Sequence, residues 1–219
     1  MPNGNELEPT VKMSNFIKKV GIQGTRATAK TALAEVKPET VPNRYAIGFD
    51  DSGSMSGQPF NDAKKAVAGF LAACSPLETS VAVYPYSHEP KPLSNMFNVV
   101  TAYVNGISLG GSTPLWANLK QLLSCNLTRG IIFSDGGPTD AETDEISIAR
   151  DKRIPVDTVY IGMGDSPVLR RIAESTGGIY LRFDNTTSFA KNLKYLSPKY
   201  VALLANSELK ERIQRGETI

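Results

Sequence analysis

The sequence predicts one α/β domain: a doubly wound, mainly parallel sheet with helices on both faces and one antiparallel edge strand. Two observations lead to this fold class. From residue 44 onward, short apolar runs rich in strand formers alternate with segments of helical period. The chain has 219 residues, 41% apolar and 21% charged, which is enough for one domain with a sizeable core and an appendage.

The individual elements follow from the spacing of apolar residues. Apolar runs rich in β-branched and aromatic residues predict strands over 44–50, 79–87, 130–135, 156–162 and 178–183. Segments with one apolar face predict helices over 59–74, 96–106, 113–125, 140–153, 166–177 and 187–196. Pro59 suits a first helical turn, and Gly177 suits a helix end. The proline-rich stretch 88–94 can be at most an edge strand.

The chain divides into three predicted parts: an N-terminal arm over 1–42, the α/β domain over 43–197 and a C-terminal helical extension over 198–219. In the arm, residues 11–21 place apolar side chains on one helical face, and 25–36 is a second helix candidate. The apolar face either packs on the domain or docks on a partner, and the sequence leaves both open. The extension starts apolar and ends charged, so we expect it to fray.

Composition excludes some classes of function. The formal charge is +2, and no basic stripe runs along any segment, so nucleic-acid binding is not expected. The start "MPNGNELEPT" is not a secretory signal, and no apolar run is long enough to span a bilayer, so we expect a soluble, cytoplasmic protein without a membrane partner. Cys74 and Cys125 lie in apolar helical patterns and are expected as reduced thiols.

Oxygen-bearing side chains gather in three loops that follow or precede predicted elements. The stretch "FDDSGSMSG" (49–57) begins at the end of a buried strand, "GGSTPLW" (110–116) leads into a helix, and "SDGG" (134–137) follows another strand. In an open doubly wound sheet, ligands bind beyond the carboxyl ends of the strands, where strand order reverses. We therefore expect these loops to converge.

The donor types in these loops suit a hard divalent cation. Hydroxyls and carboxylates without histidine or thiolate favour Mg²⁺, with Mn²⁺ or Ca²⁺ as alternatives, and disfavour zinc. Asp50 and Asp135 would together neutralise one divalent cation. Ser52, Ser54 and Thr113 can complete its coordination with water.

A pattern in the chain resembles the metal-ion-dependent adhesion site (MIDAS) of von Willebrand factor A domains: Asp50-x-Ser52-x-Ser54, then Thr113, then Asp135. The surrounding sequence resembles bacterial and phage members of that family more than the animal adhesion domains. The resemblance covers roughly residues 43 to 197. It implies that Ser52 and Ser54 ligate the metal directly and that Thr113 does so in the ligand-competent state. It also implies that Asp50 and Asp135 act mainly through bound water and hydrogen bonds.

The rim of such a site would contact a partner, and we assign Trp116, Asp51, Ser112 and Gly136 to it. Trp116 is either an exposed anchor or a side chain packed under its loop. Asp51 departs from the family pattern as a second acid. It stays outside the ligand set, because strand alternation directs its side chain away from that of Asp50. His88, the only histidine, is expected as a loop residue and not as a catalyst.

The resemblance implies an interaction module, not an enzyme, in which the metal captures an Asp or Glu side chain of a protein partner. It also implies an adaptor or subunit of a larger intracellular complex, such as an AAA+ ATPase system or the product of a stress or defence operon. Two alternatives are a metal-dependent hydrolase or phosphoryl-transfer enzyme, and a structural subunit of a phage or bacterial assembly. The oligomeric state is left open.

Overall fold

The fold is given by a computed structural model, which describes residues 37–215 and 217. The helices predicted over 11–21 and 25–36 lie outside the described residues. The chain divides into two units, Met1–Lys37 and Pro38–Ile219. The second unit, which carries every candidate site residue, is the one described below.

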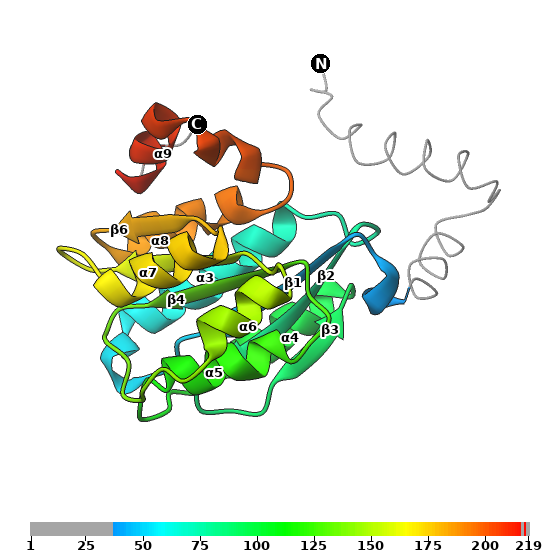
Figure 1. Cartoon of the computed structure of the whole chain (residues 1–219), viewed down its shortest axis with the longest axis horizontal. Helices are drawn as coiled ribbons and strands as arrows, with labels where there is room; N and C mark the ends of the chain where they lie inside the picture. The colour runs from blue at the N-terminus through cyan, green and yellow to red at the C-terminus, as the bar shows by residue number, and fades with distance from the viewer. Residues whose placement is uncertain (1–36, 216, 218–219) are drawn as a thin grey trace, which may run out of the picture. The chain divides into compact units, whose positions relative to one another are not determined.

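A six-stranded sheet forms the centre of this unit (Figure 1). Its strands are β1 (Asn43–Phe49), β2 (Thr79–Pro85), β3 (Lys91–Ser94), β4 (Arg129–Ser134), β5 (Val156–Ile161) and β6 (Tyr180–Phe183). The spatial order is β3-β2-β1-β4-β5-β6, and only the β2–β3 pair is antiparallel. The predicted fold class is confirmed, including the edge strand in the proline-rich stretch. Strand order reverses between β1 and β4, so the loops that follow these two strands flank the expected ligand position.

Helices cover both faces of the sheet (Figure 1). They are α3 (Gln58–Ala72), α4 (Phe97–Gly106), α5 (Leu115–Leu123), α6 (Glu145–Asp151), α7 (Pro167–Thr176), α8 (Thr186–Asn192) and α9 (Ser207–Gln214). Four short 3₁₀ turns accompany them in the described part of the chain: η1 (Pro38–Thr40), η2 (Gly53–Met55), η3 (Leu193–Leu196) and η4 (Val201–Ala205). One core cluster joins the sheet to α3, α4 and α8, and the other joins it to α5, α6 and α7.

Strand alternation divides the buried residues between the two clusters. In β4, Ile131 and Phe133 face the first cluster and Ile132 faces the second, and all three are fully buried. Phe133 stacks edge-on against Phe49 of β1, with ring centroids 5.3 Å apart. The two central strands are therefore buried on both faces, which explains their continuous apolar sequence.

The helix expected over 140–153 was placed too early in the chain. It begins at Glu145, because the carboxylate of Asp140 instead accepts hydrogen bonds from the first turn of α5. The segment expected as one helix over 187–196 splits into α8 and η3. The first difference shifts a boundary, and the second changes the last turn of the expected helix from α to 3₁₀.

The described part of the C-terminal segment packs against the domain. Leu204 of η4 and Ile213 of α9 are buried in the first core cluster. The side-chain amide of Asn192, fully buried in α8, donates to the carbonyl oxygen of Ile213 at 3.3 Å. Charged residues are frequent in α9, and this composition gave no sign that Ile213 would be an apolar anchor.

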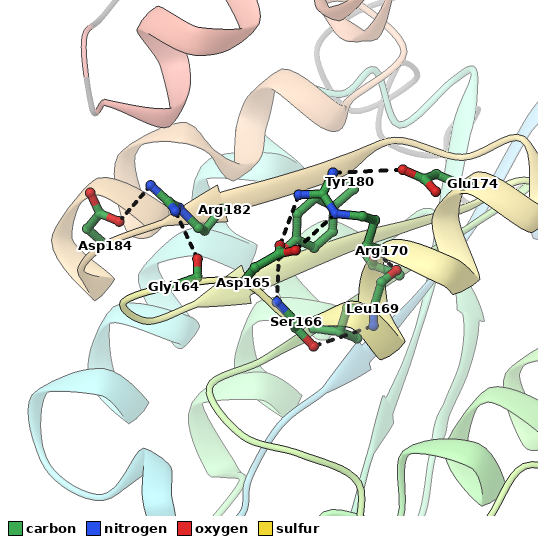
Figure 2. A network of polar contacts seen from close by, with 10 residues as sticks. Gly164, Asp165, Ser166, Leu169, Arg170, Glu174, Tyr180, Arg182 and Asp184 are labelled. Atoms are coloured by element: carbon green, nitrogen blue, oxygen red, sulfur yellow. Dashed lines mark hydrogen bonds and ion pairs between the residues drawn. The ribbon is translucent and has the colours of Figure 1, made fainter.

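The loop between β5 and α7 is fixed by a polar network at the outer edge of the sheet (Figure 2). Asp165 accepts hydrogen bonds from Arg170 at 2.9 and 3.1 Å and from the hydroxyl of Tyr180 at 2.6 Å. The hydrogen bond from Arg170 has the largest effect and that from Tyr180 the next, and together they lower the pKa of Asp165 to about 2. Ser166 caps α7 by accepting from the amide of Leu169 at 3.4 Å. Gly177, with φ of 75°, ends this helix as predicted.

Both cysteines are free and partly buried, as predicted. Burial raises the pKa of the Cys74 thiol to about 12, which keeps it protonated and unreactive at neutral pH. Among the described residues, no helix combines the length and apolar character that crossing a bilayer requires.

The central position of Ile132 gives a test of the core. Ile132→Asp places an unpaired charge in a strand buried on both faces and should lower the free energy of unfolding by about 4 kcal/mol or more. Ile132→Val should cost only about 1 kcal/mol. Urea denaturation followed by circular dichroism measures both. Similar midpoints for the two variants would contradict the assignment of Ile132 to the core.

Candidate metal centre

The first loop of the site starts with a buried carboxylate. Asp50 follows the last residue of β1 and is fully buried. Its Oδ1 accepts the amide of Ser52 at 2.9 Å, which turns the chain back over the strand end and precedes η2. Its Oδ2 accepts the hydroxyl of Ser134, the last residue of β4, at 2.6 Å. Asp50 therefore joins the carboxyl ends of the two strands at which the order reverses.

Hydroxyl groups extend this contact toward the surface. The hydroxyl oxygens of Ser52 and Ser54 lie 3.0 Å apart, and the Ser54 hydroxyl donates to Oδ1 of Asp135 at 2.7 Å. Ser52 is buried and Ser54 is exposed, so the cluster runs from the sheet edge to solvent. The structure thus brings together four of the five predicted ligands.

The charge of this cluster suits a cation. Burial raises the pKa of Asp50, and the negative charge of Asp135 acts in the same direction, whereas the hydrogen bonds from Ser134 and Ser52 lower it. No lysine or arginine among the described residues forms an ion pair with Asp50 or Asp135. A divalent cation would stabilise both carboxylates, which have no ion-pair partner among the described residues.

Thr113, the fifth predicted ligand, lies on a loop that packs against the first one. None of the hydrogen bonds within the described residues joins its hydroxyl to the other four side chains. The loops meet through their backbones: the amide of Gly110 donates to the carbonyl of Asp51 at 2.6 Å. A Cβ placed on Gly53 would lie 3.8 Å from the carbonyl oxygen of Gly111.

Thr139 and Asp140 hold the segment around Thr113 in place, and the sequence analysis did not identify either of them. The backbone of Thr113 exchanges bonds with Thr139: its amide donates to Thr139 Oγ1 at 3.2 Å, and its carbonyl accepts the Thr139 amide at 2.9 Å. Asp140 accepts the amides of Trp116 at 3.2 Å and Ala117 at 2.8 Å, in the first turn of α5. Aspartate is a known helix-capping residue, but here it caps the preceding helix and not the one that follows it in sequence.

Asp51 is not on an accessible rim, and its assignment there was wrong. Its side chain is fully buried, because strand alternation directs it toward the loop after β2. Oδ1 accepts the amide of Ser87 at 3.1 Å, and Oδ2 lies 2.5 Å from Nδ1 of His88. Nε2 of His88 lies 2.9 Å from the hydroxyl oxygen of Ser108. His88 is a loop residue, as expected, but the contacts it makes to two other loops were not foreseen.

Asp51, His88 and Ser108 follow the order of a hydrolase triad. Acyl transfer additionally requires N–H groups directed at the substrate's developing oxyanion. The amide of Gly110, two residues after Ser108, is instead bonded to the carbonyl of Asp51 at 2.6 Å. This amide is therefore not directed at a substrate, and its bond joins the loop after α4 to the loop after β1.

Trp116 is packed under its loop, so its assignment to the rim as an exposed anchor was wrong. It is 3% exposed and belongs to the second core cluster, because it lies in the first turn of α5 on the helix face toward the sheet. The guanidinium of Arg171 lies 5.6 Å from the centre of its ring. Ser112 is exposed and Gly136 is partly exposed, so both are accessible for the predicted partner contact.

The metal-binding chemistry of this centre would rest largely on hydroxyls. In the described part of the chain, no group of three His, Cys, Asp or Glu side chains is placed to hold a metal ion. The centre contains two carboxylates, Asp50 and Asp135, and its remaining candidate ligands are Ser52, Ser54 and Thr113. This donor set fits a hard cation that keeps several water ligands.

The contacts of Asp140 give a second test. Asp140→Ala removes the acceptor for two amides of α5 and should lower the free energy of unfolding by about 1 kcal/mol. Asp184→Ala is the matched control, because Asp184 is exposed and forms a surface ion pair with Arg182 that contributes little. Urea denaturation measures both variants. Equal stability of the two would show that Asp140 does not hold α5.

Several solved structures share this fold at low sequence identity. An aerotolerance-related membrane protein from Bacteroides fragilis aligns with a TM-score of 0.56 and 16% identity, over 69% of this chain and 96% of that one. BatB, a conserved hypothetical protein from Bacteroides thetaiotaomicron, aligns with a TM-score of 0.57 and 16% identity, over 74% of this chain and 98% of that one. Proximal thread matrix protein 1 from the mussel byssus was solved with a zinc-occupied MIDAS motif. It aligns with a TM-score of 0.54 and 16% identity, over 71% of this chain and 47% of that one.

A search of curated proteins finds no match to the sequence. The family described as von Willebrand factor type A domain matches residues 46–197, which contain all six strands except the first three residues of β1. This match spans well over half of the chain and includes the three loops of the candidate centre. The chain therefore belongs to the von Willebrand factor type A domain family.

Proposed function

We propose that this chain is a divalent-metal-dependent protein-interaction module. The observation that carries the proposal is the hydrogen-bonded cluster of Asp50, Ser52, Ser54 and Asp135 at the point where strand order reverses. Family membership supports it, since von Willebrand factor A domains are generally interaction modules. A protein of similar fold that holds zinc in such a motif also supports it.

In this proposal each residue of the cluster has one role. Ser52, Ser54 and Thr113 hold the metal through their hydroxyls, while Asp50 and Asp135 orient those hydroxyls and bound water. A cation with few direct carboxylate ligands remains able to accept an Asp or Glu side chain from a protein partner. Mg²⁺ is the expected ion, with Mn²⁺ or Ca²⁺ as substitutes, because the ligands contain neither imidazole nor thiolate.

We place this module inside the cell, as an adaptor or subunit of a larger complex, with an AAA+ ATPase as one candidate partner. This context rests on the resemblance to bacterial and phage domains of the family. Metal-dependent hydrolysis at Asp50 is a weaker alternative, because the single histidine is bound between Asp51 and Ser108 and not beside Asp50. A structural subunit of an assembly would use the same metal contact as a permanent joint.

Metal binding by the isolated protein tests the ligand set. Asp50→Asn and Thr113→Val each preserve side-chain shape and should weaken Mn²⁺ or Mg²⁺ binding at least tenfold by titration calorimetry. Both variants should unfold cooperatively, since loops on a rigid scaffold tolerate such changes. Asp151→Asn, an exposed carboxylate at the end of α6, is the control and should bind as the wild type does. Wild-type affinity in both site variants would refute the ligand set.

Partner capture tests the function itself. Wild type and Thr113→Val serve as baits in lysate of the native cell, each with Mg²⁺ and with EDTA. A protein retained by the wild type in Mg²⁺, and lost with EDTA and with the variant, is the expected result. A partner retained under all four conditions would show that the interaction does not depend on the metal.

A further inference from the structure

We propose that Asp51, His88 and Ser108 form a clamp that positions the metal-site loops. In this proposal the clamp fixes the loop carrying Ser52 and Ser54 relative to the loop carrying Thr113. The three residues are then positioning residues for metal binding and contact no metal themselves. The inference rests on the proposed function of the site, and none of the three belongs to the predicted ligand set.

The clamp is centred on Asp51, in which every acceptor oxygen is used. Oδ1 accepts the Ser87 amide at 3.1 Å, Oδ2 contacts Nδ1 of His88 at 2.5 Å, and the carbonyl oxygen accepts the Gly110 amide at 2.6 Å. The side chain is fully buried. Hydrogen bonds inside a protein are shielded from water and are stronger than at the surface, so these three contacts of Asp51 hold the loops after β2 and α4 in place.

His88 is suited to bridge the two outer loops because both ring nitrogens are engaged. A carboxylate only accepts hydrogen bonds, so Nδ1 donates to Asp51 and, in the neutral ring, Nε2 accepts from the hydroxyl of Ser108. The bridge links residues 37 and 20 positions apart in sequence. It closes a ring of contacts between the loops after β1, β2 and α4.

Steric contact reinforces these bonds. A Cβ on Gly110 would lie 2.0 Å from the hydroxyl oxygen and 2.3 Å from the Cβ of Ser87, so only glycine allows this approach. Gly110 is three residues before Thr113, and Asp51 lies between Asp50 and Ser52. Asp51 and Gly110, which take part in the contacts of the clamp, are therefore each within a few residues of a predicted ligand in the sequence.

The expected consequence follows from how metal sites are held in place. Residues that orient ligands without touching the metal typically contribute 10–100-fold to metal affinity. Loss of the side-chain bridge leaves the Thr113 loop and the Ser52 loop joined by fewer contacts, among them the Gly110–Asp51 backbone bond, so the ligands are less well ordered before the metal binds. Affinity should fall, while the sheet and its core remain intact.

The experiment measures Mn²⁺ affinity of the full chain by electron paramagnetic resonance, together with the thermal unfolding midpoint. His88→Ala should weaken Mn²⁺ binding about tenfold. His88→Gln should recover most of the affinity, because its amide can donate to Asp51 and accept from Ser108. Ser108→Ala, a change at an exposed position, should give an intermediate loss without affecting folding.

Asn105→Ala is the matched control, a neutral change at an exposed residue near the end of α4. It should bind Mn²⁺ as the wild type does. Wild-type affinity in His88→Ala, or equal losses in His88→Ala and His88→Gln, would overturn the clamp and leave the proposed function standing. Absence of Mn²⁺ binding by the wild type itself would overturn both.

Discussion

The hydrogen bond from the Ser134 hydroxyl to the Asp50 carboxylate, 2.6 Å long and fully buried, is the contact on which the rest of the centre depends. It joins the ends of β1 and β4, the two neighbouring strands from which the chain extends the sheet in opposite directions. Because the carboxylate is fixed there, the chain after Asp50 must turn over the strand end. That turn brings Ser52 and Ser54 toward Asp135.

Much of the fold was predictable because its signals are local. A strand buried on both faces, such as β4, is a continuous apolar run, and helices such as α7 carry an apolar face and a glycine at the end. The boundaries were less predictable where polar residues serve a distant element. Asp140 looks like the start of its own helix, but its carboxylate accepts amides of α5. Ile213 is one apolar anchor in a charged segment.

The candidate centre was predictable in part for the same reason. Asp50, Ser52 and Ser54 form a compact pattern after a strand, and Asp135 follows the neighbouring strand in the same way. The bridge through His88 gives no local signal, since its partners are 37 and 20 residues away and lie on loops without a recognisable pattern. The solved structures that share the fold at about 16% identity show that very different sequences can form this scaffold.

The bonds between Thr113 and Thr139 have a mechanical consequence. The backbone of the second loop is bonded twice to the third loop, and Asp140 of that third loop is bonded to the first turn of α5. These segments share so many contacts that they have few independent degrees of freedom. Thr113 and the first turn of α5 are therefore both bonded to the same short stretch of chain, Thr139 and Asp140. The position of the Thr113 hydroxyl is thus set by the same segment that fixes the start of α5.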